Sequence, residues 1–192
     1  MITYVNDTSG WEAWQLEYKY GALYIFPPAG VIEPVDALRR AHDPHSAAIC
    51  QAHISLSEPL PGPLTQTHLA DLRAALHTTA AFDVRYGPLR SFPPFPGVVY
   101  AIQPEAEILR LRAIIHATSA FVGVPLRRKD NAPHMTIAEF ITAERTHELL
   151  EELQGVVPEG TFLCDAIEYA VPNDRFIFER RLAIPLGASS GR

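Results

Sequence analysis

Proline limits the length of every element that this chain can form. The sequence has 17 Pro among 192 residues. Pro donates no backbone hydrogen bond and is poorly tolerated inside helices and central strands, so the elements must fit between the prolines. Residue patterning predicts strands over 21–26, 47–56, 82–92, 98–102, 134–140, 161–170 and 175–184, and helices over 33–41, 65–80, 104–123 and 142–154.

The order of the predicted elements repeats along the chain. From residue 48 a strand is followed by a helix and two β stretches, and from residue 134 the same order returns. This order favours an α+β fold with two similar lobes. Between the first helix and the repeat, Asp43-Pro44-His45 is predicted as a turn, and Arg39 and Arg40 lie opposite the apolar face of that helix.

Four His-x-Ser/Thr tripeptides occur, beginning at His53, His77, His116 and His134. On a strand, residues i and i+2 point to the same side, so an imidazole and a hydroxyl can act on one ligand. On a helix the same two positions diverge by roughly 200°. The tripeptides at His77 and His116 fall in predicted helices. The candidates are therefore His53 with Ser55 and His134 with Thr136.

The strand histidines could instead be structural residues or metal ligands. Either imidazole alone is more often a structural residue that is satisfied by a backbone carbonyl, but two of them in matching order across a repeat favour a shared site. A zinc site would need further ligands, and no HExxH or CxxC pair is present. We therefore expect no metal and no cofactor.

The sequence resembles the 2H phosphoesterase superfamily, which contains bacterial 2′-5′ RNA ligase-like proteins and 2′,3′-cyclic phosphodiesterases. The resemblance rests on GALYIFPP, HDPHSAAICQAHISLSEPL and APHMTIAEF, and it spans roughly residues 20 to 185. It implies two pseudo-symmetric lobes of antiparallel sheet with flanking helices and an active site in the cleft between them. By the same resemblance, residues 1–19 are an N-terminal extension and 20–192 form one bilobal domain.

The resemblance makes His53 and His134 catalytic, and Ser55 and Thr136 the groups that bind the substrate phosphate. The chemistry agrees, because opening a cyclic phosphate needs one base and one acid, and two imidazoles can hold opposite protonation states near neutral pH. Arg127 and Arg128, in a basic loop with Lys129, could bind a second phosphate. Phe92, Phe95 and Tyr100 could stack on a base, although such aromatics are more often core residues.

Charge and hydropathy narrow the class of ligand. The formal net charge is −6, whereas proteins that hold duplex nucleic acid along a broad face usually carry a basic excess. We expect a small nucleotide or an RNA end as substrate, and no duplex DNA. No apolar run approaches the ~20 residues that span a bilayer, and no secretory signal pattern is visible, so a cytoplasmic monomer without membrane contact is expected.

The sequence thus predicts a metal-independent enzyme that hydrolyses, or reversibly ligates, a 2′,3′-cyclic or 2′-5′ phosphodiester. Two alternatives stay open. One is a phosphodiesterase acting on a small metabolite such as an ADP-ribose cyclic phosphate. The other is a nucleotide-binding module with little turnover.

Overall fold

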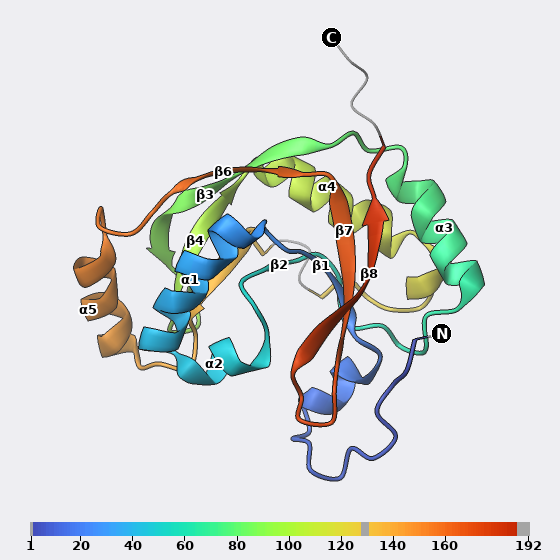
Figure 1. Cartoon of the computed structure of the whole chain (residues 1–192), viewed down its shortest axis with the longest axis horizontal. Helices are drawn as coiled ribbons and strands as arrows, with labels where there is room; N and C mark the ends of the chain where they lie inside the picture. The colour runs from blue at the N-terminus through green and yellow to red at the C-terminus, as the bar shows by residue number, and fades with distance from the viewer. Residues whose placement is uncertain (1, 128–130, 188–192) are drawn as a thin grey trace.

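The computed structural model describes residues 2–127 and 131–187, and within them the strands form two four-stranded antiparallel sheets with helices around them (Figure 1). The first sheet has the order β2 (Ile54–Ser55), β1 (Ala22–Ile25), β7 (Ala166–Pro172), β8 (Phe178–Pro185). The second has the order β5 (His134–Ala138), β4 (Val98–Gln103), β3 (Phe82–Ser91), β6 (Gly160–Cys164). The predicted α+β class with two antiparallel lobes is confirmed.

The helices connect and cover these sheets. They are α1 (Ala29–His42), α2 (Pro44–Ile49), α3 (Gln66–Leu76), α4 (Glu105–His116) and α5 (Ala143–Leu153), with short 3₁₀ helices η1 (Gln15–Tyr20) and η2 (Ser119–Phe121). The helix predicted to reach residue 123 ends at His116, and η2 follows it after a turn. Among the helices that the structure describes, none is long and apolar enough to cross a membrane.

The two sheets are built alike but are not contiguous halves of the chain. In each, the motif strand is an edge strand paired with a strand that a helix connects to it: β1–α1–β2 in one sheet and β4–α4–β5 in the other. The expected lobes of consecutive elements are wrong. β3 and β4 follow the first motif yet belong to the sheet of β5, and β7 and β8 complete the first sheet. The predicted strand 161–170 is two strands, β6 and β7, which carry the chain from one sheet to the other (Figure 1).

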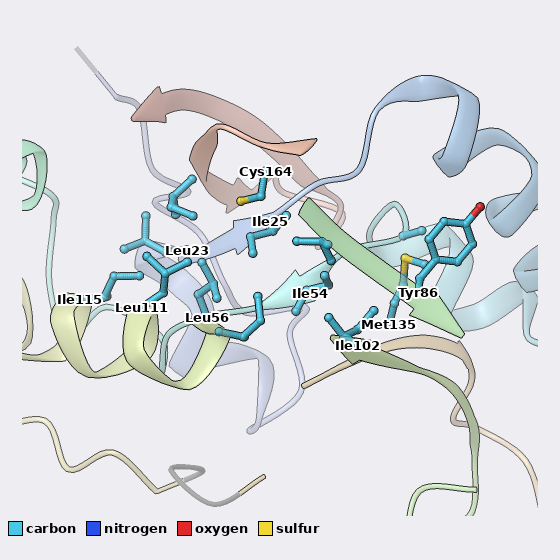
Figure 2. Packing of buried hydrophobic residues seen from close by; sticks show 14 of the residues in the cluster. Leu23, Ile25, Ile54, Leu56, Tyr86, Ile102, Leu111, Ile115, Met135 and Cys164 are labelled. Carbon is cyan, nitrogen blue, oxygen red and sulfur yellow. The ribbon is translucent and has the colours of Figure 1, made fainter. Parts of the chain in front are cut away.

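One apolar cluster joins the two lobes. Leu23 of β1 and Leu56, directly after β2, lie near Leu111 and Ile115 of α4 (Figure 2). Ile54 lies in the same cluster as Met135 of the second motif strand, and both side chains are fully buried. A shared core of this kind stabilises the relative position of the two motif strands.

Helix α2 takes in two residues of the predicted turn, Pro44 and His45, and residues 47–49, which were predicted as the start of the strand 47–56. Asp43 is its N-cap, since one carboxylate oxygen accepts a hydrogen bond from the Ser46 N–H at 3.1 Å, and Pro44 follows in the first turn. The other oxygen accepts from the N–H groups of Glu139 and Phe140, at 2.8 and 3.1 Å. The predicted turn residue Asp43 is therefore a buried link between α2 and the chain that leaves β5.

Replacing Asp43 with Ala should test this link. The change removes a helix cap and leaves two further, partly buried N–H groups without their acceptor, so the free energy of unfolding should fall by roughly 1–4 kcal/mol. Urea denaturation followed by circular dichroism measures it. The matched control is Asp83→Ala, on the exposed side of β3, which should change stability by less than about 0.5 kcal/mol. Equal effects of the two changes would contradict the proposed link.

Candidate active site

The two predicted strand tripeptides meet at one cavity of about 600 Å³. Alternation along each strand places His53, Ser55, His134 and Thr136 in its wall, whereas the residues between them point into the core. The two discarded tripeptides lie elsewhere: His77 is the C-cap of α3 and His116 the last residue of α4, and neither lines the cavity.

Both histidine rings are oriented by the same backbone contact. The Nδ1 of His53 lies 2.7 Å from the carbonyl oxygen of Gln51, and the Nδ1 of His134 lies 3.0 Å from that of Ala132. In each case the carbonyl belongs to the residue two positions earlier. Since a carbonyl can only accept, Nδ1 carries the proton, and Nε2 is the nitrogen of each neutral ring with a lone pair for proton transfer.

Two buried arginines fix the backbone that precedes each histidine. Arg39 of α1 donates through Nη1 to the carbonyl of Cys50 at 2.6 Å, and Arg112 of α4 donates through Nη1 to that of Asn131 at 2.6 Å. Each carbonyl lies three residues before its motif histidine. The two arginines are thus equivalent in the two repeats. Predicted to face away from the apolar side of its helix, Arg39 is instead buried, 2% exposed.

These arginines also connect the site to the neighbouring elements. Arg112 donates through Nε and Nη2 to the carbonyl of Ser55, so α4 holds both motif strands at once. Arg39 pairs with Asp36 at 2.8 Å and donates to the Ser46 carbonyl and hydroxyl. Arg39 and Arg112 both line the cavity, and the positive charge of their guanidinium groups favours an anionic ligand there.

The surroundings of His53 favour the neutral form of its ring. Desolvation by the surrounding walls, helped by the positive charge of Arg39 and by the neighbouring His134, lowers its pKa from 6.5 to about 4, against the bond to the Gln51 carbonyl. His53 and His134 line the same cavity. At neutral pH the His53 ring is therefore neutral, with Nε2 able to accept a proton.

Aromatic rings pack against both imidazoles. The Phe92 ring lies over His134 with ring centroids 4.1 Å apart, and the Tyr24 ring meets His53 edge-on at 4.7 Å. Phe92 and Phe95 line the cavity as predicted for a stacking surface. The same prediction is wrong for Tyr100, which is fully buried, packs against the Tyr86 ring and donates its hydroxyl to the Pro158 carbonyl.

The predicted basic loop contributes one described residue. Arg127 does not line the cavity, and its guanidinium lies 3.4 Å from the Glu17 carboxylate at the surface. Arg128 and Lys129 lie outside the described residues, so their predicted roles are not addressed. Within residues 2–127 and 131–187, no group of three or more His, Cys, Asp or Glu side chains is placed to hold a metal ion.

Sequence patterns missed several residues of this wall. Arg39, Arg112 and Tyr24 come from elements that precede the motif strands, and Trp14, Tyr18, Phe176 and Phe178 come from the N-terminal segment and from the region around the β7–β8 turn. One sequence signal could have identified the two arginines: Arg39 and Arg112 lie at equivalent places, late in a helix that precedes a motif strand.

The fold and the site define this chain as a member of the 2′-5′ RNA ligase superfamily, whose sequence model matches residues 27–174. This confirms the resemblance to 2H phosphoesterases. A Bacillus cytotoxicus protein named "putative phosphoesterase" is 28% identical over 137 residues, which cover 69% of this chain and 76% of that protein. A Bacillus cereus protein of the same description is 27% identical over 161 residues, covering 80% of this chain and 84% of the relative.

Solved structures share the fold. The crystal structure of Escherichia coli LigT in its apo form superposes with a TM-score of 0.56 at 14% identity, covering 86% of this chain and 96% of LigT. TT0787 of Thermus thermophilus gives a TM-score of 0.54 at 17% identity, covering 87% of this chain and 97% of that protein.

The lowered pKa of His53 can be measured directly. Histidine resonances followed by NMR from pH 3 to 8 should show His53 titrating near pH 4, and His53→Asn should identify its signal. A His53 midpoint near 6.5 would mean that the cavity wall does not desolvate the ring.

Proposed function

We propose that the protein is a metal-independent phosphoesterase that opens, or in reverse forms, a 2′,3′-cyclic or 2′-5′ phosphodiester of an RNA end or a small nucleotide. The observation that carries the proposal is the paired arrangement at the cavity. Two histidines line the same cavity, and each is held by the carbonyl two residues before it. The two hydroxyl residues, each two positions after its histidine, line that cavity as well. A phosphate between them could be approached from both sides.

The low pKa of His53 assigns it the role of base. Its neutral Nε2 takes the proton from the attacking hydroxyl or water as the new bond to phosphorus forms. His134 then acts as the acid and gives a proton to the ribose oxygen that leaves. After one turnover His53 holds an added proton and His134 has lost one, and both rings return to their starting states by exchanging protons with solvent. In the reverse direction the two roles exchange.

Ser55 and Thr136 would stabilise the charge that builds on the phosphate. A hydroxyl can donate to a non-bridging oxygen, and such bonds strengthen as negative charge develops in the transition state. The positive charges of Arg39 and Arg112 in the same wall add to this field. The mechanism requires no metal ion, because both proton transfers and the charge stabilisation come from side chains.

Structures of the relative with the same fold support a nucleotide as the ligand class. Escherichia coli LigT has been solved in complex with 3′-AMP, with ATP and with NADP⁺, at TM-scores of 0.55, 0.53 and 0.52 to this chain. Their identity to this chain is 15%, which establishes the shared fold and leaves the ligand of this chain a proposal.

Replacing either catalytic histidine tests the function. His53→Ala and His134→Ala should each lower turnover of a panel of 2′,3′-cyclic nucleotides by roughly 10²–10⁴-fold, because each removes one of two proton transfers. The double variant should lose little more, since the two groups act together. Activity of the wild type should be unchanged in EDTA.

The matched control is His77→Ala, which removes the histidine of an identical type of tripeptide outside the cavity. It should turn over substrate as the wild type does. Ser55→Ala and Thr136→Val should cost less than the histidine variants, since each removes one donor among several. Wild-type activity in His53→Ala would refute the mechanism. A wild type that binds cyclic nucleotides without turnover would instead favour the binding-module alternative.

The pH profile distinguishes which histidine is the base. kcat/KM reports the free enzyme, so its acidic limb should follow His53 and lie near pH 4, with activity falling as pH drops through that value because the base becomes protonated. Circular dichroism at each pH controls for unfolding. An acidic limb near 6.5 in a folded enzyme would transfer the role of base to another group.

A further inference from the structure

Asp36 of α1 is a buried carboxylate that contacts the backbone before His53 without lining the cavity. It is 7% exposed. Its Oδ1 accepts hydrogen bonds from the Arg39 guanidinium at 2.8 Å and from the Ala52 N–H at 2.9 Å. Because Ala52 is itself buried, its N–H depends on an acceptor within the protein. Asp36 therefore holds the residue that immediately precedes the motif histidine.

The N–H that Asp36 binds and the carbonyl that orients His53 belong to one peptide group. The carbonyl oxygen of Gln51 lies 2.7 Å from Nδ1 of His53, and the nitrogen of the same peptide group is that of Ala52. This peptide is trans, so its C=O and N–H point in opposite directions. The carboxylate of Asp36 and the imidazole of His53 are thus joined through a single rigid group.

Arg39 fixes the preceding peptide group, so the ion pair holds the chain on both sides of Gln51. While it pairs with Asp36, Arg39 donates through Nη1 to the Cys50 carbonyl at 2.6 Å. Hydrogen bonds in a chain polarise one another, so the negative charge of Asp36 makes the Gln51 carbonyl a stronger acceptor. A stronger acceptor keeps the proton on Nδ1 of His53 and stabilises the ring when Nε2 takes up a second proton.

The second repeat differs at both positions that this arrangement needs. Arg112 is the equivalent of Arg39, but the residue three positions before it is Leu109, whose side chain cannot accept a hydrogen bond. Pro133 stands immediately before His134, and proline has no N–H. The carbonyls orient both motif histidines alike. Only in the first repeat, however, does the orienting peptide have an N–H that a carboxylate can accept.

We propose that Asp36 is a positioning residue for His53: acting through the peptide between Gln51 and Ala52, it fixes the proton on Nδ1 and stabilises the imidazolium that forms when His53 acts as the base. This inference rests on the proposed function and goes beyond it, because it explains why the base belongs to the first repeat. The proton from the attacking hydroxyl or water goes to Nε2, Nδ1–H keeps its bond to the carbonyl, and no proton passes to Asp36. His134 has no such N–H before it, which suits a group that gives up its proton.

The other charged or titratable groups around His53 are left unchanged by a substitution at position 36. They line the same cavity and come from several elements: Tyr18 of η1, Tyr24 of β1, Arg39 of α1, Arg112 of α4, His134 of β5 and Glu139 directly after β5. Arg39 and His134 both lower the pKa of His53. A negative charge acts in the opposite direction, so removing the charge of Asp36 should lower the pKa of His53 further.

Two substitutions at position 36 separate positioning from charge. Asp36→Ala removes the acceptor, so kcat on 2′,3′-cyclic nucleotides should fall by roughly 10–100-fold, with KM within about 2-fold because Asp36 does not line the cavity. Asp36→Asn keeps an oxygen acceptor and should recover most of the lost kcat, while the acidic limb of kcat/KM and the His53 titration midpoint both move to lower pH. ¹⁵N NMR at neutral pH should show an Nδ1-protonated His53 in the wild type and in Asp36→Asn, and mixed tautomers in Asp36→Ala.

Asp71→Ala is the matched control, because Asp71 of α3 also accepts from a backbone N–H, that of Ser119 at 2.6 Å, and does not line the cavity. Its kcat and His53 spectrum should be those of the wild type. A wild-type His53 tautomer in a folded Asp36→Ala variant would overturn the proposal. If Asp36→Ala does not fold, Asp36→Asn decides, and an unchanged His53 midpoint there overturns it. If the His53 spectra respond as expected but the wild type turns over no phosphodiester, the positioning of His53 stands and the proposed catalytic function fails.

Discussion

Each motif strand is fixed by the apolar side chains that alternate with its polar ones. Ile54 and Leu56 on one strand, and Met135 and Ile137 on the other, are at most 1% exposed and belong to one core cluster. Because the side chains of a strand alternate in direction, burying these residues turns the histidine and the hydroxyl of each motif toward the cavity. A shift of one residue in either strand would bury the imidazole and expose the core, so the packing of the core sets the geometry of the site.

The two arginines extend this constraint to the backbone before each motif. Arg39 and Arg112 each donate to the carbonyl three residues before a motif histidine, and each histidine bonds the carbonyl one residue further along. Their charges also act on the site, since Arg39 contributes to the low pKa of His53. Arg39 and Arg112 therefore fix the backbone before each motif histidine, and Arg39 also favours a neutral His53 before substrate binds.

Local patterns predicted the motif strands and most helices, because the i, i+2 rule needs only the sequence. They failed where partners are distant. The first residues of the strand predicted over 47–56 belong to a helix instead, because Asp43 and Pro44 are a cap and first-turn pair that starts one. Order along the chain cannot say which strands pair, so the sequence contained no sign that β3 and β4 join the sheet of the second motif while β7 and β8 join that of the first. Tyr100 lies on a strand covered on both faces, and periodicity gives no sign of which face meets a ligand.

The proposed mechanism depends on one phosphate held between both histidines. A crystal structure of the enzyme soaked with a nucleoside 2′-monophosphate tests this most directly. We expect the phosphate within hydrogen-bond distance of Nε2 of both His53 and His134, with the Ser55 and Thr136 hydroxyls on its non-bridging oxygens. A phosphate bound by only one of the imidazoles, or held at the Arg127 loop away from the cavity, would contradict the mechanism.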